Sequence, residues 1–107
     1  MKKVLLAEME KEAFGRGWIF RCNKAEYPYE NKVEFMVRED ADSPSGFSLI
    51  VISGCKAGLT LVRLPQESFM PDLGIGKEWL VNNWTKWIYP ECPVEEVEIY
   101  RNEIGTS

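Results

Sequence analysis

Few side chains in this sequence have the types and spacing that chemistry requires. Two carboxylate pairs, Asp40/Asp42 and Glu95/Glu96, have the composition of an acid–base site. Such a site needs two carboxyl groups placed across a cleft, with the pKa of one raised by burial. Both pairs lie in polar stretches, so we expect a solvated loop and a solvated strand edge instead. Asp40-Ala-Asp42 also lacks the downstream glycine and glutamate spacing of a calcium-binding EF loop.

Histidine is absent, and the cysteines have no pairing pattern. Without histidine the chain lacks the usual general base near neutral pH and the side chain that activates a catalytic serine or cysteine. The three cysteines, Cys22, Cys55 and Cys92, are odd in number and include no Cys-x-x-Cys pair. We therefore expect inert thiols, with neither a disulfide framework nor a zinc site.

One glycine-containing stretch resembles a phosphate-binding loop. Gly74-Ile-Gly76-Lys77 precedes a predicted helix, but Pro71 stands where the pattern needs glycine, and Glu78 where it needs Ser or Thr. Glycine that gives the chain room to turn at a helix N-terminus explains this stretch. Together these observations predict no catalytic residue, no metal and no cofactor.

The composition is that of one soluble globular domain spanning residues 1–107, with 45% apolar and 28% charged residues. The apolar run at 4–7 ends at Glu8, well short of the roughly 7–15 residues of an export signal. No other segment approaches the ~20 apolar residues of a membrane span. We expect a cytoplasmic protein that does not enter membranes.

Negative charge is concentrated at the C-terminal end. The net charge of the chain is −4, and residues 88–107 carry five acids and one base, which accounts for all of it. Binding to nucleic acid needs a basic stripe that neutralises phosphates, so this distribution argues against it. The same distribution fits electrostatic steering toward a positively charged protein.

The elements that must position these side chains follow from periodicity and turn residues. The segment 4–13, rich in Glu, Lys, Ala and Leu, predicts a helix, and 77–88 predicts a second helix that Pro90 ends. Alternating or β-rich segments predict strands at 18–22, 32–39, 47–53, 59–64 and 94–101. We expect a turn at 27–31, a loop at 40–46 and a hairpin connection at 54–58.

The predicted helix at 77–88 carries an apolar stripe. Trp79, Trp84 and Trp87 fall within one arc of about 200° at 100° per residue. Such a stripe is typical of a core between a helix and a sheet, so we assign the three tryptophans to the core. The predicted fold class is α+β, a single domain in which an antiparallel β-sheet has one or two helices packed on one face.

A resemblance to a known family rests on two longer segments, GCKAGLTLVRLPQES at 54–68 and KEWLVNNWTKWIYPECPV at 77–94, with Gly15-Arg-Gly-Trp18 and Tyr27-Pro28 as landmarks. The chain resembles the immunity protein 45 family of bacterial polymorphic-toxin systems, such as those of contact-dependent growth inhibition. The resemblance covers most of the chain after about residue 13. It implies an α+β protein without enzyme activity that binds and silences one cognate toxin, often a nuclease. Where many relatives have His-Lys-Ala-Gly this chain has Cys55, so no role of that histidine is carried over.

These observations lead to the hypothesis of a stoichiometric inhibitor. A nuclease toxin must attract phosphate, so its active cleft is basic, and an acidic strand edge can dock there. On the last predicted strand, Val97 and Ile99 point to one side and the acids with Tyr100 to the other. Tyr100 is the expected anchor, because aromatic side chains are enriched in binding hot spots. The predicted partner-binding residues are Glu91, Glu95, Glu96, Glu98 and Tyr100, with Asp40 and Asp42 as secondary candidates.

Three other interpretations stay open. The glutamates can serve solubility alone, since exposed charge is the norm. The chain can be an adaptor domain that pairs with a partner through a sheet edge. It can also bind a small ligand, or act as a minimal enzyme, through the Trp-rich helix and carboxylates, and a deep pocket lined by Trp79, Trp84 or Trp87 would favour this reading.

Overall fold

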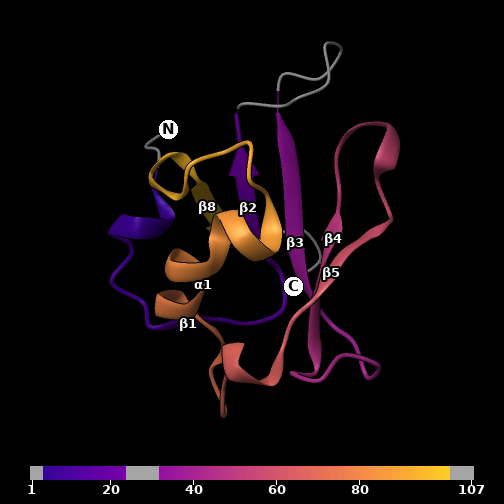
Figure 1. Ribbon diagram of the computed structural model, residues 1–107, viewed down its shortest axis with the longest axis vertical. Coiled ribbons are helices and arrows are strands. Elements are labelled where there is room, and N and C mark those ends of the chain that lie inside the picture. The colour runs from indigo at the N-terminus through magenta and orange to yellow at the C-terminus, as the bar shows by residue number, and fades with distance from the viewer. Residues whose placement is uncertain (1–3, 24–31, 102–107) are drawn as a thin grey trace.

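The chain folds into two antiparallel sheets and one α-helix within the residues that the structure describes (Figure 1). The computed structural model describes residues 4–23 and 32–101. The strands are β1 (Ala13–Phe14), β2 (Trp18–Cys22), β3 (Val33–Glu39), β4 (Phe47–Val51), β5 (Thr60–Arg63), β6 (Phe69–Met70), β7 (Gly74–Gly76) and β8 (Glu98–Arg101). The helix α1 (Lys77–Asn83) continues into a π-helix at Trp84–Ile88. Short 3-10 turns are η1 (Leu6–Glu8), η2 (Gly54–Lys56), η3 (Gln66–Ser68) and η5 (Val94–Glu96).

The larger sheet forms the body of the molecule. Its strand order is β5-β4-β3-β2-β8, and every neighbouring pair is antiparallel. The smaller sheet has the order β1-β7-β6, and α1 lies over one face of the larger sheet (Figure 1). This arrangement confirms the predicted α+β fold class, an antiparallel sheet with a helix on one face.

Alternation along β3 places its side chains on the two faces of the sheet. Val33, Phe35 and Val37 are buried on the helix side, while Met36 and Arg38 point to the opposite, outer face. The predicted strands at 18–22 and 32–39 are thereby confirmed. The turn predicted at 27–31 lies outside the described residues.

β4 and β5 form the predicted hairpin. Gly54 (φ 71°) and Gly58 (φ 97°) in its connection take positive φ values that suit glycine. The backbone amide of Gly58 donates to the carbonyl of Val51 at 2.6 Å and closes the connection. The glycines therefore fix the register in which β5 returns along β4.

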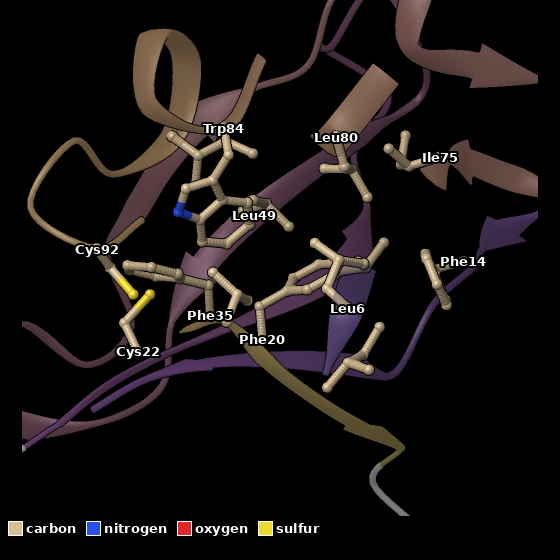
Figure 2. Packing of buried hydrophobic residues seen from close by; sticks show 14 of the residues in the cluster. Leu6, Phe14, Phe20, Cys22, Phe35, Leu49, Ile75, Leu80, Trp84 and Cys92 are labelled. Carbon is tan, nitrogen blue, oxygen red and sulfur yellow. The ribbon is translucent and has the colours of Figure 1, made fainter. Parts of the chain in front are cut away.

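The helix packs on the sheet through Leu80, Trp84 and Ile88, which recur at every fourth position and are all buried. Trp84 is 1% exposed, and its ring centroid lies 5.6 Å from that of Phe20 and 6.4 Å from that of Phe35 (Figure 2). The predicted helix at 77–88 is confirmed in extent. Its last part is wider than an α-helix, because the amide of Tyr89 donates to the carbonyl of Trp84, five residues back, at 3.1 Å.

The assignment of all three tryptophans to the core is wrong for Trp87. Trp87 is 38% exposed, and its ring lies 5.8 Å from that of Trp79, which is half-buried. The π-helix adds a residue to the last turn and so changes the direction of every side chain after it. Ideal α-helical angles therefore placed Trp87 on the wrong side.

The helix predicted at 4–13 is also wrong, since only η1 is helical there. The amide of Leu6 donates to the carbonyl of Val97 at 2.8 Å, and the amide of Ile99 donates to the carbonyl of Val4 at 2.9 Å. Further along, β1 pairs with β7. Strand-like pairing and the complete burial of Leu6 thus override the helical propensity of the segment.

The last predicted strand, at 94–101, is shorter than expected. Its first residues form η5, which follows Pro93, and β8 begins at Glu98. Val97 and Ile99 point into the core as predicted, with 0% and 3% exposure. The segment that precedes β8 therefore runs over the surface before it joins the sheet.

Replacing Trp84 with alanine should destabilise the protein much more than replacing Trp87. The first change leaves a cavity in the core and should cost about 3–5 kcal/mol of the free energy of unfolding. The second removes an exposed ring and should cost less than about 1 kcal/mol. Urea denaturation of both variants measures the difference, and equal losses would contradict the core assignment.

Gly74→Ala should be far more harmful than Gly58→Ala. Both glycines have positive φ, but a Cβ on Gly74 would lie 2.4 Å from the carbonyl oxygen of Phe14, whereas one on Gly58 meets nothing within 4 Å. We expect Gly58→Ala to cost about 1 kcal/mol from backbone strain, and Gly74→Ala at least about 2 kcal/mol more. Thermal unfolding of the matched pair tests whether β1 and β7 approach this closely.

Candidate partner-binding surface

The outer face of the larger sheet carries a network centred on Glu34. This carboxylate is 8% exposed and accepts hydrogen bonds from Arg21 Nε at 3.0 Å and from the Tyr100 hydroxyl. The Arg21 guanidinium lies 4.8 Å from the centre of the Tyr100 ring, and its Nη1 is 3.6 Å from Glu98 Oε1. Asn23 Nδ2 donates to Glu98 Oε2 at 2.7 Å. The network ties β2, β3 and β8 together through their side chains.

Hydrogen bonds keep Glu34 ionised although it is buried. Burial alone would raise its pKa, but the hydrogen bonds from Tyr100 and Arg21, with the charges of Arg21 and Lys32, outweigh burial and lower the pKa below its usual value. Burial, followed by the hydrogen bond to Glu34, raises the pKa of Tyr100. The network is therefore a charged cross-link of the sheet at neutral pH.

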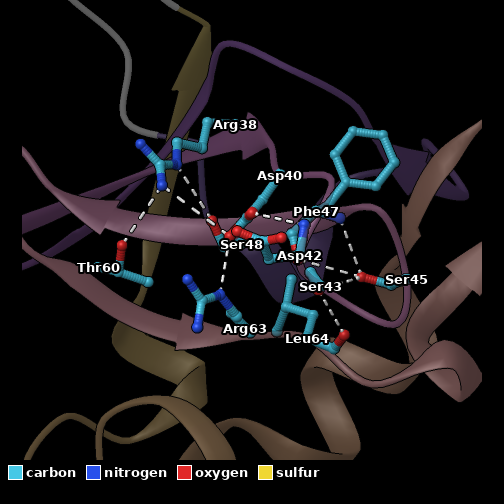
Figure 3. Close-up of polar contacts among 10 residues, drawn as sticks. All are labelled: Arg38, Asp40, Asp42, Ser43, Ser45, Phe47, Ser48, Thr60, Arg63 and Leu64. Carbon is cyan, nitrogen blue, oxygen red and sulfur yellow. Dashed lines mark hydrogen bonds and ion pairs between the residues drawn. The ribbon is translucent and has the colours of Figure 1, made fainter.

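A second network on the same face holds the loop that follows β3 (Figure 3). Asp40 Oδ1 accepts the backbone amide of Asp42 at 3.0 Å, and its Oδ2 lies 3.2 Å from Arg63 Nε and 3.9 Å from Arg38 Nη2. The hydrogen bond from the backbone amide of Asp42, together with the hydrogen bond from Arg63, lowers the pKa of Asp40 against the opposing effect of burial. Arg38 Nε also donates to Ser48 Oγ at 3.3 Å.

The prediction of a solvated loop is wrong at Asp40. Glu98 lies on the outer face, as the alternation predicted, but it is buried there. Asp40 is 8% exposed and Glu98 is 7% exposed, because arginine side chains reach both carboxylates. Tyr100 is half-buried and hydrogen-bonded within the sheet, and Asp42 is exposed. The strand alternation was right, but the face it identified is filled by paired side chains.

Glu91, Glu95 and Glu96 remain exposed in the segment between the π-helix and β8. Cys92 anchors this segment, since it is buried and its thiol points toward that of Cys22 (Figure 2). Its Sγ lies 3.7 Å from the carbonyl oxygen of Pro93. The backbone is thus held against the core while the three glutamates face outward.

Elements from other parts of the chain bring more acids beside these glutamates. η1 contacts both η5 and α1, and α1 in turn contacts η3. No periodicity in the sequence indicates these neighbours, because each contact is tertiary. The helix-side acidic surface, as we name it, consists of exposed glutamates on these elements and the segment before η5: Glu8, Glu67, Glu78, Glu91, Glu95 and Glu96.

Two shallow grooves run along α1 within this surface. Both are lined by Met70 and Glu78, so they are continuous. The larger groove, of about 540 Å³, reaches the N-terminal residues 10–12. The smaller groove, of about 330 Å³, reaches Glu67 and Trp79. The acidic surface is therefore hollowed where it adjoins an aromatic side chain.

Neither a metal-ligating cluster nor an activated Cys22 thiol is found in the described part of the chain. Among residues 4–23 and 32–101, no three His, Cys, Asp or Glu side chains gather in a way that could hold a metal ion. Burial, reinforced by the neighbouring Cys92, raises the pKa of the Cys22 thiol and suppresses the thiolate that a nucleophile needs. None of the helices in the described part of the chain has the length and apolar composition to cross a bilayer.

The two outer-face carboxylates should make the protein sensitive to acid. The pKa values of Glu34 and Asp40 are lowered in the folded state, so their stabilisation is complete above the unfolded-state pKa of about 4 and is lost as the pH falls through the folded-state values. Glu34→Gln with Asp40→Asn should flatten the decline in the free energy of unfolding below about pH 5. Urea denaturation across this range measures it, and an unchanged slope in the double variant would refute the assignment.

Comparison with known proteins identifies a family for this chain. The family model for immunity protein 45 matches residues 6–99. This range includes α1, all the residues that line the two grooves, and all the glutamates of the helix-side acidic surface. No curated protein and no solved structure matches the chain. The resemblance seen in the sequence is confirmed, and the chain belongs to the immunity protein 45 family.

Proposed function

We propose that this chain neutralises a cognate protein toxin by binding it stoichiometrically, and that the toxin is a nuclease with a basic active cleft. Membership of an immunity protein family supports a toxin as the partner. The observation that carries the mode of binding is the helix-side acidic surface. Its exposed glutamates come from η1, η3, α1, η5 and the segment before η5, and η1 contacts η5 and α1 while α1 contacts η3. The protein acts by occupying the toxin and turns over no substrate.

Electrostatic complementarity gives this binding its speed and selectivity. A surface that gathers carboxylates attracts a basic cleft from a distance, and it competes there with the phosphates of the nucleic acid. Association of this kind weakens steeply as salt rises, because exposed charges are screened within about 10 Å at 0.1 M ionic strength. The toxin should therefore be captured quickly in the cell that makes it.

The predicted contact residues divide into two groups. Glu91, Glu95 and Glu96 are exposed and form the proposed direct contact. Glu98 and Asp40 hold arginine side chains on the outer face, so we assign them a positioning role in the fold. Tyr100 and Asp42 keep exposed surface and remain candidates for a second contact, through the outer face of the sheet.

The other two functions are less well supported by the geometry. Pairing through the β8 edge meets an obstacle, because residues 4–6 already bond to Val97 and Ile99 there. A small-ligand site in the helix would need a deep pocket at the tryptophans. Trp84 instead lies in the packed core, and Trp79 lines an open groove.

Reversing the charge of Glu91 and Glu95 to lysine should slow toxin association. We expect the rate constant to fall about tenfold at low salt, with a smaller loss at high salt, because the change acts on steering. The measurement is surface plasmon resonance with the toxin whose gene adjoins that of this chain, together with survival of cells that express the toxin.

The matched control is Glu39→Lys with Asp72→Lys, which makes the same change of charge at two exposed acids that line a different hollow. This pair should leave association nearly unchanged. An equal effect from both pairs would move the contact away from the helix-side acidic surface. Failure of the unmodified chain to bind or protect would dismiss the inhibitor function itself.

A further inference from the structure

The π-helix brings together two tryptophans, of which Trp79 is half-buried and Trp87 is exposed. On a regular α-helix, residues eight positions apart are separated by about 12 Å along the axis, yet the rings of Trp79 and Trp87 lie 5.8 Å apart at 57°. The wide last turn, closed by the bond from Tyr89 to Trp84, brings the rings together. Trp87 does not contribute to the core, since it is 38% exposed.

Trp79 lines the smaller groove next to two carboxylates. Glu67 comes from η3 and Glu78 from the first turn of α1, and both are exposed lining residues of this groove of about 330 Å³. Within the described part of the chain no basic side chain lines it. Neither glutamate makes an ion pair with another described residue. The groove therefore combines an aromatic wall with two uncompensated charges.

Such a combination selects a cation that is also flat. A cation over an indole face gains about 0.5–2 kcal/mol, with Trp the best of the aromatic side chains. The guanidinium of arginine stacks on aromatic rings and donates to carboxylates in a planar fork, whereas the ammonium of lysine is a compact, strongly hydrated charge. A purely apolar occupant would leave both carboxylates without a partner.

We propose that this groove receives an arginine side chain of the partner protein, which stacks on Trp79 and donates to Glu67 and Glu78. The identity of the partner rests on the proposed function, whereas the preference of the groove for arginine does not. The helix-side acidic surface would then have a defined anchor at its centre, because tryptophan and arginine dominate binding hot spots. The ring of Trp87 packs against that of Trp79 at 5.8 Å.

The test uses a short arginine peptide and its uncharged counterpart. Acetyl-Gly-Arg-Gly-amide is titrated into the full chain while the indole N–H signals are followed by NMR, with Trp79→Phe and Trp87→Phe to assign them. The same peptide with citrulline in place of arginine keeps the shape and removes the charge. We expect the Trp79 signal to shift with a millimolar dissociation constant for arginine, and binding about fivefold weaker or more for citrulline.

Glu67→Gln with Glu78→Gln should weaken binding of the arginine peptide at least about fivefold. Glu39→Gln with Asp72→Asn, at two exposed acids that line a different hollow, is the matched control that should not weaken it. An unshifted Trp79 signal, equal binding of citrulline, or equal loss in the control pair each overturns the inference. The Trp84 signal reports whether each variant is folded.

A parallel titration with the toxin separates this inference from the proposed function. If the unmodified chain binds the toxin and the Glu67→Gln, Glu78→Gln variant binds it equally well, the arginine contact is refuted and the inhibitor function stands. A loss of about tenfold in the variant, with the control pair unchanged, supports the contact. If the unmodified chain does not bind the toxin, the proposed function fails, whatever the peptide shows.

Discussion

Packing of Trp84 between the helix and the sheet is the contact from which the architecture is built. Its ring meets Phe20 and Phe35 on the inner face of the sheet, so it joins α1 to β2 and β3 at one point. Within the described residues the indole Nε1 has no hydrogen-bond partner, which shows that this site favours ring volume over polar bonding. The π-helix begins at this residue, so the same anchor directs Trp87 outward.

Those elements whose local pattern agrees with their tertiary neighbours could be predicted from the sequence. The alternation of β3 and the stripe of Leu80, Trp84 and Ile88 indicate directly which side chains are buried. The glycines between β4 and β5 indicate the turn that joins these strands. Residues 4–13 could not be predicted in this way, because their helical composition competes with pairing to a strand at the far end of the chain. A π-helix also has no signature in hydrophobic periodicity.

The charge distribution on the surface could be predicted only in part, because the order of charged residues along the sequence does not show which of them form ion pairs. Residues 88–107 hold the whole net charge, yet Glu98 is compensated by Arg21 on the outer face. Glu67 and Glu78 lie in a part of the chain whose charges cancel in sequence. In space they line one groove that has no base among its lining residues, while Lys11 and Lys77 line the adjoining groove with Glu78. The two faces of the sheet thus differ in kind: paired networks stiffen the outer one, and exposed glutamates mark the helix side.

The bond between Leu6 and Val97 sets the order in which the molecule can be completed. Hairpins such as β3–β4–β5 join nearby residues and can form early, but β2 must wait for β8, and residues 4–6 must wait for the same strand. A nascent chain therefore carries an unpaired sheet edge until β8 has left the ribosome. The sheet, in which residues 4–6 and β2 both join β8, is complete only after β8 has been translated.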